Sequence, residues 1–145
     1  MEDENLLMRS HLKVGTDLLF LEEVLQWFEQ ITTPFLPPDL SYECKIAITE
    51  GFTNVVRHAH HGLSKNTPID IQVKILSNSI EIKLWDFGQP FDFPKTLHFI
   101  LNEKIAPLEK EQGRGLILMY KLTDEVTYCR LDDHRNCLTM RRHFS

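Results

Sequence analysis

The run from Glu50 to His58 holds residue types suited to acid–base and metal chemistry. Glu50 and Asn54 are four positions apart, so they lie on the same face if the segment is helical. A carboxylate in that position can act as a general base. An amide oxygen one turn later is a neutral ligand for a Mg²⁺ ion that already holds phosphate groups. Taken alone, the same spacing is also typical of an ordinary solvated helix face.

Two further segments combine glycine with a charged residue. Asp86-Phe87-Gly88 ends a run of alternating apolar residues. There the carboxylate can accept a hydrogen bond from an exocyclic amine such as that of adenine, and the glycine permits close approach to a flat base. Gly113-Arg114-Gly115-Leu116 is predicted to open a helix, whose backbone N–H groups and arginine suit a phosphate. Alone, these segments are more simply a turn and a flexible helix start.

The elements that must position these segments follow from hydrophobic spacing. Apolar residues at helical intervals predict a helix over residues 16–31, with Thr16 as its N-cap. A second helix is predicted from Asp39 to about His61, where Gly62 ends it. Alternation predicts strands over residues 6–14, 68–76, 80–86, 125–131 and 137–142. A turn is expected over residues 132–136, and a last helix over 116–123.

The long connection after Asp86 is predicted to be a functional lid, because compact domains rarely contain unstructured loops of this length. The lid spans about residues 89–112, and residues 95–103 within it favour a short helix. The predicted order of elements is β-α-α-β-β-lid-α-β-β. Hairpin-linked strands form an antiparallel or mixed sheet, and the helices must bury their apolar faces on one side of it. We therefore predict a two-layer α/β sandwich.

Composition limits the class of protein. A chain of 145 residues with 42% hydrophobic content suits one domain, expected over residues 1–145. The net charge of -5 argues against a partner bound by neutralising nucleic-acid phosphates. The sequence contains no run of about 18 apolar residues, so no membrane span is predicted. Its acidic start lacks the basic region of a signal peptide. Three cysteines without CxxC spacing indicate buried or half-buried free thiols. We expect a soluble cytoplasmic protein.

Together and in this order, the three segments resemble the GHKL ATPase superfamily and, within it, the anti-sigma-factor serine/threonine kinases. The resemblance covers nearly the whole chain. Glu50-x-x-x-Asn54, with the trailing Arg57-His58-Ala59, is similar to their N box. Asp86-x-Gly88, followed by Pro90-Phe91-Asp92, resembles their first glycine box, and Gly113-Arg114-Gly115-Leu116 resembles their second. Where many relatives carry another glycine, this chain has Gln89-Pro90, which stiffens the first turn of the lid.

The resemblance implies a Bergerat-type ATP-binding fold, with a mixed, mainly antiparallel sheet, and the cofactors ATP and Mg²⁺. It implies Glu50 as the catalytic base that takes the proton of a substrate serine, and Asn54 as the magnesium ligand. Asp86 would bind the adenine amine. The implied nucleotide-binding residues are Asn54, Arg57, His58, Asp86, Gly88, Phe91, Gly113, Arg114, Gly115 and Leu116.

The implied partners are an anti-sigma-factor antagonist, a sigma factor or similar regulator, and a second copy of the chain. Two other hypotheses stay open from the residues themselves. One is a binding module that holds a partner without transferring phosphate. The other is a globular protein with no nucleotide site. The histidines at positions 58, 60 and 61 also suggest a metal site, but a polar helix end near the nucleotide is the simpler interpretation.

Overall fold

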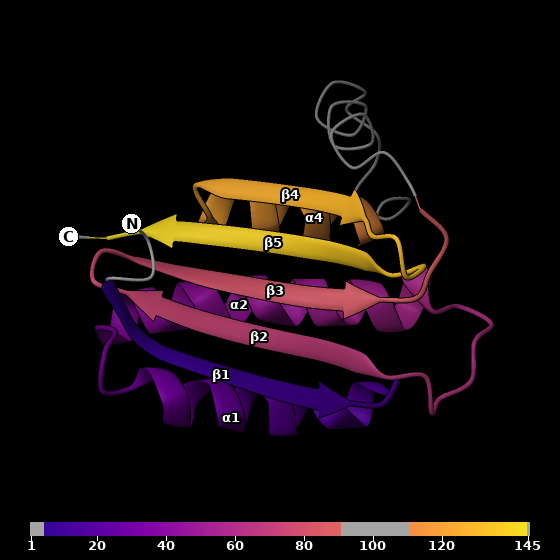
Figure 1. The fold of residues 1–145 in the computed structure, drawn as a ribbon, viewed down its shortest axis with the longest axis horizontal. Helices are drawn as coiled ribbons and strands as arrows, with labels where there is room; N and C mark the ends of the chain where they lie inside the picture. The colour runs from indigo at the N-terminus through magenta and orange to yellow at the C-terminus, as the bar shows by residue number, and fades with distance from the viewer. Residues whose placement is uncertain (1–4, 91–110, 145) are drawn as a thin grey trace.

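The structure is a computed structural model that describes residues 5–90 and 111–144, with side chains in the second range described from residue 115. Within these residues, five strands form one sheet in the order β1-β2-β3-β5-β4 (Figure 1). Every pairing is antiparallel, so the sheet is not mixed. The strands are β1 (Leu6–Val14), β2 (Ile69–Leu76), β3 (Ser79–Asp86), β4 (Glu125–Arg130) and β5 (Asn136–His143).

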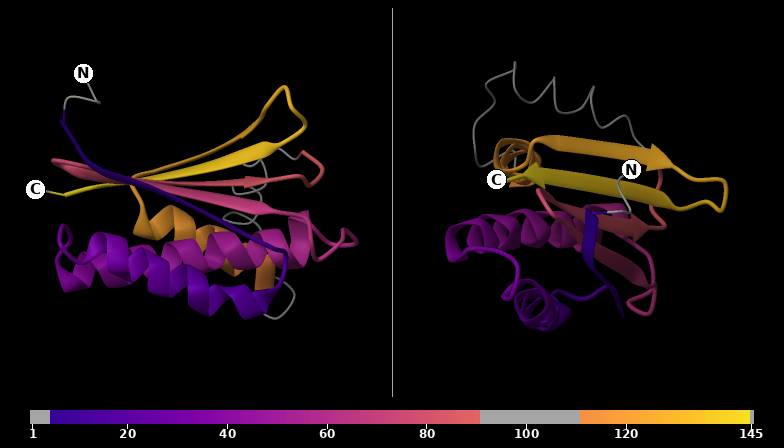
Figure 2. Two further views of the ribbon diagram at one scale, coloured as in Figure 1. Left: turned by 60° about the horizontal axis from the view of Figure 1, so that its bottom comes forward. Right: turned by 60° about the vertical axis from the view of Figure 1, so that its left-hand side comes forward.

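The helices cover one face of this sheet, which confirms the predicted two-layer sandwich (Figure 2). They are the 3-10 turn η2 (Leu18–Phe20), α1 (Leu21–Thr32), α2 (Pro38–Asn54), the π-helical segment η3 (Val55–Ala59) and α4 (Glu111–Leu122). The opposite face of the sheet carries no helix of the described chain. No helix among these residues is long and apolar enough to cross a membrane.

The core lies between the sheet and α2. Alternate residues of β2 and β3 point toward the helices and are almost fully buried, and Ile48 and Phe52 of α2 meet them. Burial of each such side chain stabilises the fold by about 1.5–3 kcal/mol. The apolar side of α1 also serves the core: Phe28 is fully buried, and Trp27 Nε1 donates to Ser10 Oγ at 3.1 Å.

The first two helices begin differently from the prediction. Thr16 is not an N-cap, because its hydroxyl donates to Thr67 O at 2.7 Å. Asp17 caps η2 instead by accepting from Leu19 N at 2.9 Å, and α1 follows at Leu21. α2 starts at Pro38, one residue before Asp39, because proline at the first helical position needs no N–H partner.

The end of α2 and the last hairpin also need correction. The predicted single helix to His61 changes to π-helical turns at Val55, and Gly62 then takes a left-handed φ of 85°. Asn136 is not in the turn: it is the fully buried first residue of β5, because its side chain bonds to Asp86. Cys129 is exposed rather than buried, since it lies on the edge strand β4 and its side chain projects from the sheet face that no described helix covers.

Residues predicted as the lid fall mostly outside the described chain. Phe91 and the predicted helix over 95–103 lie outside the described residues. The last helix starts earlier than predicted. α4 begins at Glu111, so Gly113 is in its first turn and Gly115 in its second, rather than before the helix. Glu and Gln at positions 111 and 112 are good helix formers, which favours this extension over the cost of about 1 kcal/mol for a helical glycine.

Candidate functional site

α2 brings the predicted base and metal ligand to the side of the helix that packs against α4. Glu50 and Asn54 are both half-buried, one turn apart. Gly51, between them, faces the sheet: a Cβ atom there would lie 3.4 Å from Leu138 and 3.5 Å from Leu84. The glycine thus lets α2 lie close to β3 and β5, and this fixes the height of Glu50 and Asn54 above the sheet.

Glu50 meets the second glycine segment directly. A Cβ atom on Gly115 would lie 2.8 Å from Glu50 Oε2 and 3.9 Å from Glu50 Cβ. The carboxylate therefore occupies the space that any other residue at position 115 would fill. Two of the three predicted segments meet at this contact.

Asp86, at the end of β3, is 2% exposed and receives hydrogen bonds on both oxygens. Oδ1 accepts from Gly88 N and from Asn136 Nδ2, each at 2.8 Å, and Oδ2 accepts from the Tyr128 hydroxyl at 3.3 Å. An ionised carboxylate has about four acceptor positions. One position therefore remains on Asp86, on the oxygen that holds the longest of the three bonds.

The donors around Asp86 come from β4 and β5. Burial, and after it the Asp86 carboxylate, raise the pKa of Tyr128, so the phenol keeps its proton and acts as a donor. Asn136 Nδ2 and Arg130 Nη1 also donate to Gly88 O, at 2.8 and 3.0 Å. Below, we use "Asp86 clamp" for Tyr128, Arg130 and Asn136, which hold Asp86 and Gly88 in place.

A small cavity joins the predicted segments. It measures about 10 Å³ and is lined by Gly51, Asn54, Val55, Asp86, Leu116, Met119, Tyr128 and Leu138. Three of these residues were predicted from the sequence and share this cavity: Asn54, Asp86 and Leu116. A volume of about 10–15 Å³ holds one water molecule. An aromatic base needs more room than the described residues leave in this cavity.

Gly88 makes its close approach to main chain. A Cβ atom there would come within 2.5 Å of Ala59 O in η3. The prediction that this glycine permits contact with a base stays untested, but its tight packing against η3 is a finding. Gly88 thereby fixes the end of β3 against the end of η3.

His60 connects Phe87, which follows β3, to Thr16, which follows β1. Its Nε2 accepts from Phe87 N at 2.8 Å. The Thr16 hydroxyl already donates to Thr67 O, so it accepts from His60 Nδ1, at 2.8 Å. His60 is therefore neutral, with its proton on Nδ1. Burial lowers its pKa, and the Asp86 carboxylate opposes that shift.

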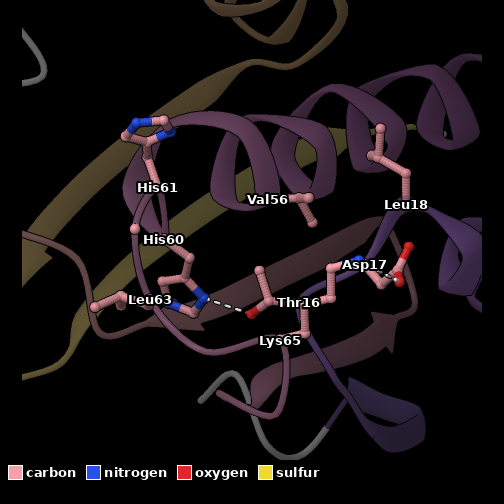
Figure 3. A pocket seen from close by; sticks show the side chains of 9 residues that line it. Thr16, Asp17, Leu18, Val56, His60, His61, Leu63 and Lys65 are labelled. Carbon is pink, nitrogen blue, oxygen red and sulfur yellow. Dashed lines mark hydrogen bonds and ion pairs between the residues drawn. The ribbon is translucent and has the colours of Figure 1, made fainter.

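Figure 3 shows the Thr16–His60 bond at the wall of an open hollow of about 320 Å³, on the α1 side of η3. The rim also holds His61, Leu63 and Lys65. The described residues contain no group of three side chains able to hold a metal ion, so the histidines do not form one there. His60 itself is buried, and both of its ring nitrogens are engaged.

Several predicted residues do not line the small cavity. Arg57 and His58 are exposed on η3 and are not among the residues that form its walls. The surroundings of Gly113 and the side chain of Arg114 are outside the described part of the chain, as is Phe91. Their roles stay predictions.

Sequence reasoning missed the Asp86 clamp and His60. Neither Tyr128 nor Asn136 belongs to a recognisable sequence motif: Tyr128 lies within a predicted strand, and Asn136 lies just before one. The one available signal was the polar Asn136 at the start of an apolar strand, and it was interpreted as part of the turn. His60 carried no signal, because two neighbouring histidines suggested a shared polar surface.

The chain matches the histidine kinase-like ATPase domain family over residues 17–142. It is also 36% identical over 93 residues to serine-protein kinase RsbW of Staphylococcus aureus, in an alignment that covers 59% of this chain and 55% of the relative. The alignment thus spans only a little over half the length of the curated relatives.

Two solved structures share the fold. The crystal structure of the SiaB–SiaC complex from Pseudomonas aeruginosa matches with a TM-score of 0.62 and 14% identity, over 98% of this chain and 92% of that one. The RsbU and RsbW domains of a Mycobacterium tuberculosis protein match with a TM-score of 0.66 and 13% identity, over 94% of this chain and 33% of that one. At these identities the likeness concerns the fold alone.

Proposed function

The chain belongs to the histidine kinase-like ATPase domain family and is homologous to the RsbW serine-protein kinases, and we propose that it is an ATP-dependent serine/threonine protein kinase. Its proposed substrate is a serine of an anti-sigma-factor antagonist, and its second proposed partner is a sigma factor or similar regulator that it sequesters. The observation that carries the proposal is the meeting of α2, the end of β3 and α4, where Glu50 contacts Gly115 and Asn54 shares a cavity with Asp86.

Each residue has a distinct proposed role. Glu50 accepts the proton of the substrate hydroxyl. The Asn54 amide oxygen holds Mg²⁺, and the remaining acceptor position of Asp86 takes the adenine amine. Bound Mg·ATP supplies the phosphoryl group and neutralises its charge. Because phosphoryl transfer depends on positioning and electrostatics, these few groups suffice for the protein's part.

The donor set fits a magnesium nucleotide, but the cavity of about 10 Å³ does not yet admit the base. We assign the necessary opening to Tyr128, whose hydroxyl makes the longest of the three bonds to Asp86, at 3.3 Å. Displacing this side chain uncovers Asp86 Oδ2 and widens the space beside Leu116 and Met119. A Tyr128→Phe variant, which gives up the bond and keeps the ring, should therefore bind ATP at least as tightly as the wild type.

The first experiment is calorimetric titration of the full chain with Mg·ATP, followed by transfer of labelled phosphate to a candidate antagonist. Glu50→Gln should keep nucleotide affinity and lose transfer by about 10²–10⁴-fold. Glu125→Gln makes the same chemical change on the exposed start of β4 and serves as the matched control. Undiminished transfer by Glu50→Gln would exclude this residue as the base.

A non-catalytic partner-switching module is the second candidate. It is favoured by the limited alignment with the kinases, which covers 55% of the relative. Such a module would bind Mg·ATP and a partner protein but label no partner. The half-buried Glu50 against Gly115 supports the kinase instead, since a purely binding protein does not need a carboxylate at that place.

A further inference from the structure

Two cysteines face each other across the last hairpin. Cys129 of β4 and Cys137 of β5 are register partners. Partners in an antiparallel pair send their side chains to the same face of the sheet. Leu138 and Met140 of β5 point into the core, so Cys137 and Cys129 point to the face that carries no helix of the described chain.

The pairing pattern sets the separation of the two cysteines. Leu131 N donates to Arg135 O at 2.7 Å and closes the hairpin. Because hydrogen-bonded and non-hydrogen-bonded pairs alternate along the ladder, Cys129 and Cys137 form the next hydrogen-bonded pair, with Cα atoms about 5.5 Å apart. Disulfides join Cα atoms about 4.4–6.8 Å apart. Joining the thiols needs side-chain rotation and an approach of the Cβ atoms from about 5.5 Å to about 3.5–4.5 Å, which changes the local spacing of the two strands.

The surroundings of the two thiols differ. Cys129 is exposed and open to a small oxidant, whereas Cys137 is buried. Burial raises the pKa of the Cys137 thiol, so this group is a poor first nucleophile. The third cysteine, Cys44, is buried in the core, and burial raises its pKa to about 11. These differences make Cys129 the attacking residue and Cys137 the resolving one.

The pair adjoins the Asp86 clamp in sequence. Cys129 lies between Tyr128 and Arg130, and Cys137 follows Asn136. These neighbours point to the opposite face of the same strands and donate to Asp86 or Gly88. Any change in the twist or spacing of β4 and β5 at the cysteines is therefore transmitted to the clamp.

We propose that Cys129 and Cys137 are a redox modification site that forms a reversible disulfide and thereby controls the Asp86 clamp. The oxidant is a peroxide. Cys129 thiolate attacks one peroxide oxygen, breaks the O–O bond and becomes a sulfenic acid, and the other oxygen leaves as water after protonation. Cys137 sulfur then attacks Cys129 sulfur, and the S–S bond forms as a second water leaves. Two thiols lose two electrons, which reduce one peroxide; a dithiol reverses the step.

The test treats the full chain with hydrogen peroxide and measures free thiols and intact mass. The expected result is a monomer that has lost two of its three thiols and the mass of two hydrogen atoms, with one cross-linked peptide pair containing Cys129 and Cys137. Cys129→Ser and Cys137→Ser should abolish this product, and Cys44→Ser, the matched control, should retain it. Covalent dimers through Cys129, or Cys129 oxidised to an acid beside a free Cys137 thiol, would overturn the proposal.

The effect on the clamp rests on the proposed function and needs a separate measurement. Oxidised protein should bind Mg·ATP about tenfold more weakly than reduced protein, as expected for the loss of one of the hydrogen bonds by which Arg130 and Asn136 position Gly88 and Asp86. Dithiothreitol should restore the affinity, and Cys137→Ser should show no change with peroxide. A disulfide that leaves affinity unaltered would exclude the coupling. Absence of ATP binding in the reduced protein would refute the proposed function and leave the disulfide standing.

Discussion

The Glu50 carboxylate occupies the side-chain space of Gly115: a Cβ atom on that glycine would lie 2.8 Å from Glu50 Oε2. Glycine at position 115 is therefore required by the placement of a carboxylate on another helix. Real Cβ atoms do not approach another atom so closely, so one of the two groups must yield if position 115 gains a side chain. The flexible end of Glu50 yields more easily than α4.

Gly115→Ala should therefore move the proposed base without unfolding the protein. Removing a glycine from the second turn of α4 favours the helix by about 1 kcal/mol, which offsets the crowding. A displacement of about 1 Å at a reacting group costs about 10²-fold in rate. We expect phosphate transfer to fall by about that factor while the midpoint of thermal unfolding changes little. Wild-type transfer by this variant would show that the position of Glu50 is not critical.

Asp86→Asn should weaken nucleotide binding. The substitution replaces a charged acceptor by an amide whose nitrogen faces donors, so the bonds from Tyr128 and Asn136 cannot both be kept. Hydrogen bonds to charged groups contribute about 1.5–3 kcal/mol, so we expect the dissociation constant for ATP to rise about 10- to 100-fold. Calorimetric titration measures it. Asp39→Asn, on the exposed first turn of α2, is the matched control, and equal affinities for both variants would contradict the role of Asp86.

Much of the fold could be predicted because its strands follow simple alternation. Ile69, Ile71 and Val73 point to a core, and the predicted strand over 68–76 differs from β2 by one residue. The first residues of the helices were harder to predict. Proline at position 38 and the cap at Asp17 depend on local backbone geometry that hydrophobic spacing does not encode. The π-helical turn at η3 likewise leaves no periodic signal.

The residues of the candidate site likewise divide into those that the sequence predicts and those that it does not. Asn54, Asp86 and Leu116 were predicted because they belong to short segments with a recognisable order, and they do share a cavity. Tyr128 and Asn136 were missed because their role arises only when β3, β4 and β5 are aligned. Partners distant in the chain, such as Asn136 and Asp86, are decided by strand register, which the sequence alone left open.

Gly88→Ala should destabilise the fold and the site together. The added methyl would lie 2.5 Å from Ala59 O, a backbone atom that cannot rotate away. Overpacking of this kind costs about 1–3 kcal/mol, and chemical denaturation should show a loss in that range. ATP affinity should also fall, because the shifted loop carries the hydrogen bond from Gly88 N to Asp86.

Gly62→Ala provides the comparison for Gly88→Ala. Its Cβ would meet no atom within 4 Å, but its φ of 85° is unfavourable for alanine. A left-handed conformation costs about 1–2 kcal/mol, so a similar loss of stability is expected. This variant should bind ATP as the wild type does. If the two variants lost affinity equally, the effect of Gly88 would be one of general stability and not of its contact with the site.

His60 should make the stability of the fold depend on pH. Its folded pKa is lowered from an ordinary value near 6.5, mainly by burial, so the unfolded chain binds its proton more readily. The stabilisation is therefore complete above about pH 6.5 and is lost as pH falls toward the folded pKa. Protonation at Nε2 also removes the acceptor of Phe87 N, beside Asp86. The free energy of unfolding, measured in urea from pH 8 to pH 5, should decline over this range.

His60→Gln, which stays neutral and keeps polar atoms at the site, should flatten that decline. The matched control is His11→Gln. His11 lies on the exposed side of β1, where its Nε2 is 3.2 Å from Asp70 Oδ1, so this variant should retain the wild-type loss of stability in acid. Nitrogen-15 NMR of the imidazoles adds a direct measurement. In the folded protein, His60 Nε2 should stay unprotonated to a pH below the ordinary pKa near 6.5, and protonation of Nε2 at that ordinary value would refute the proposed hydrogen-bonding role.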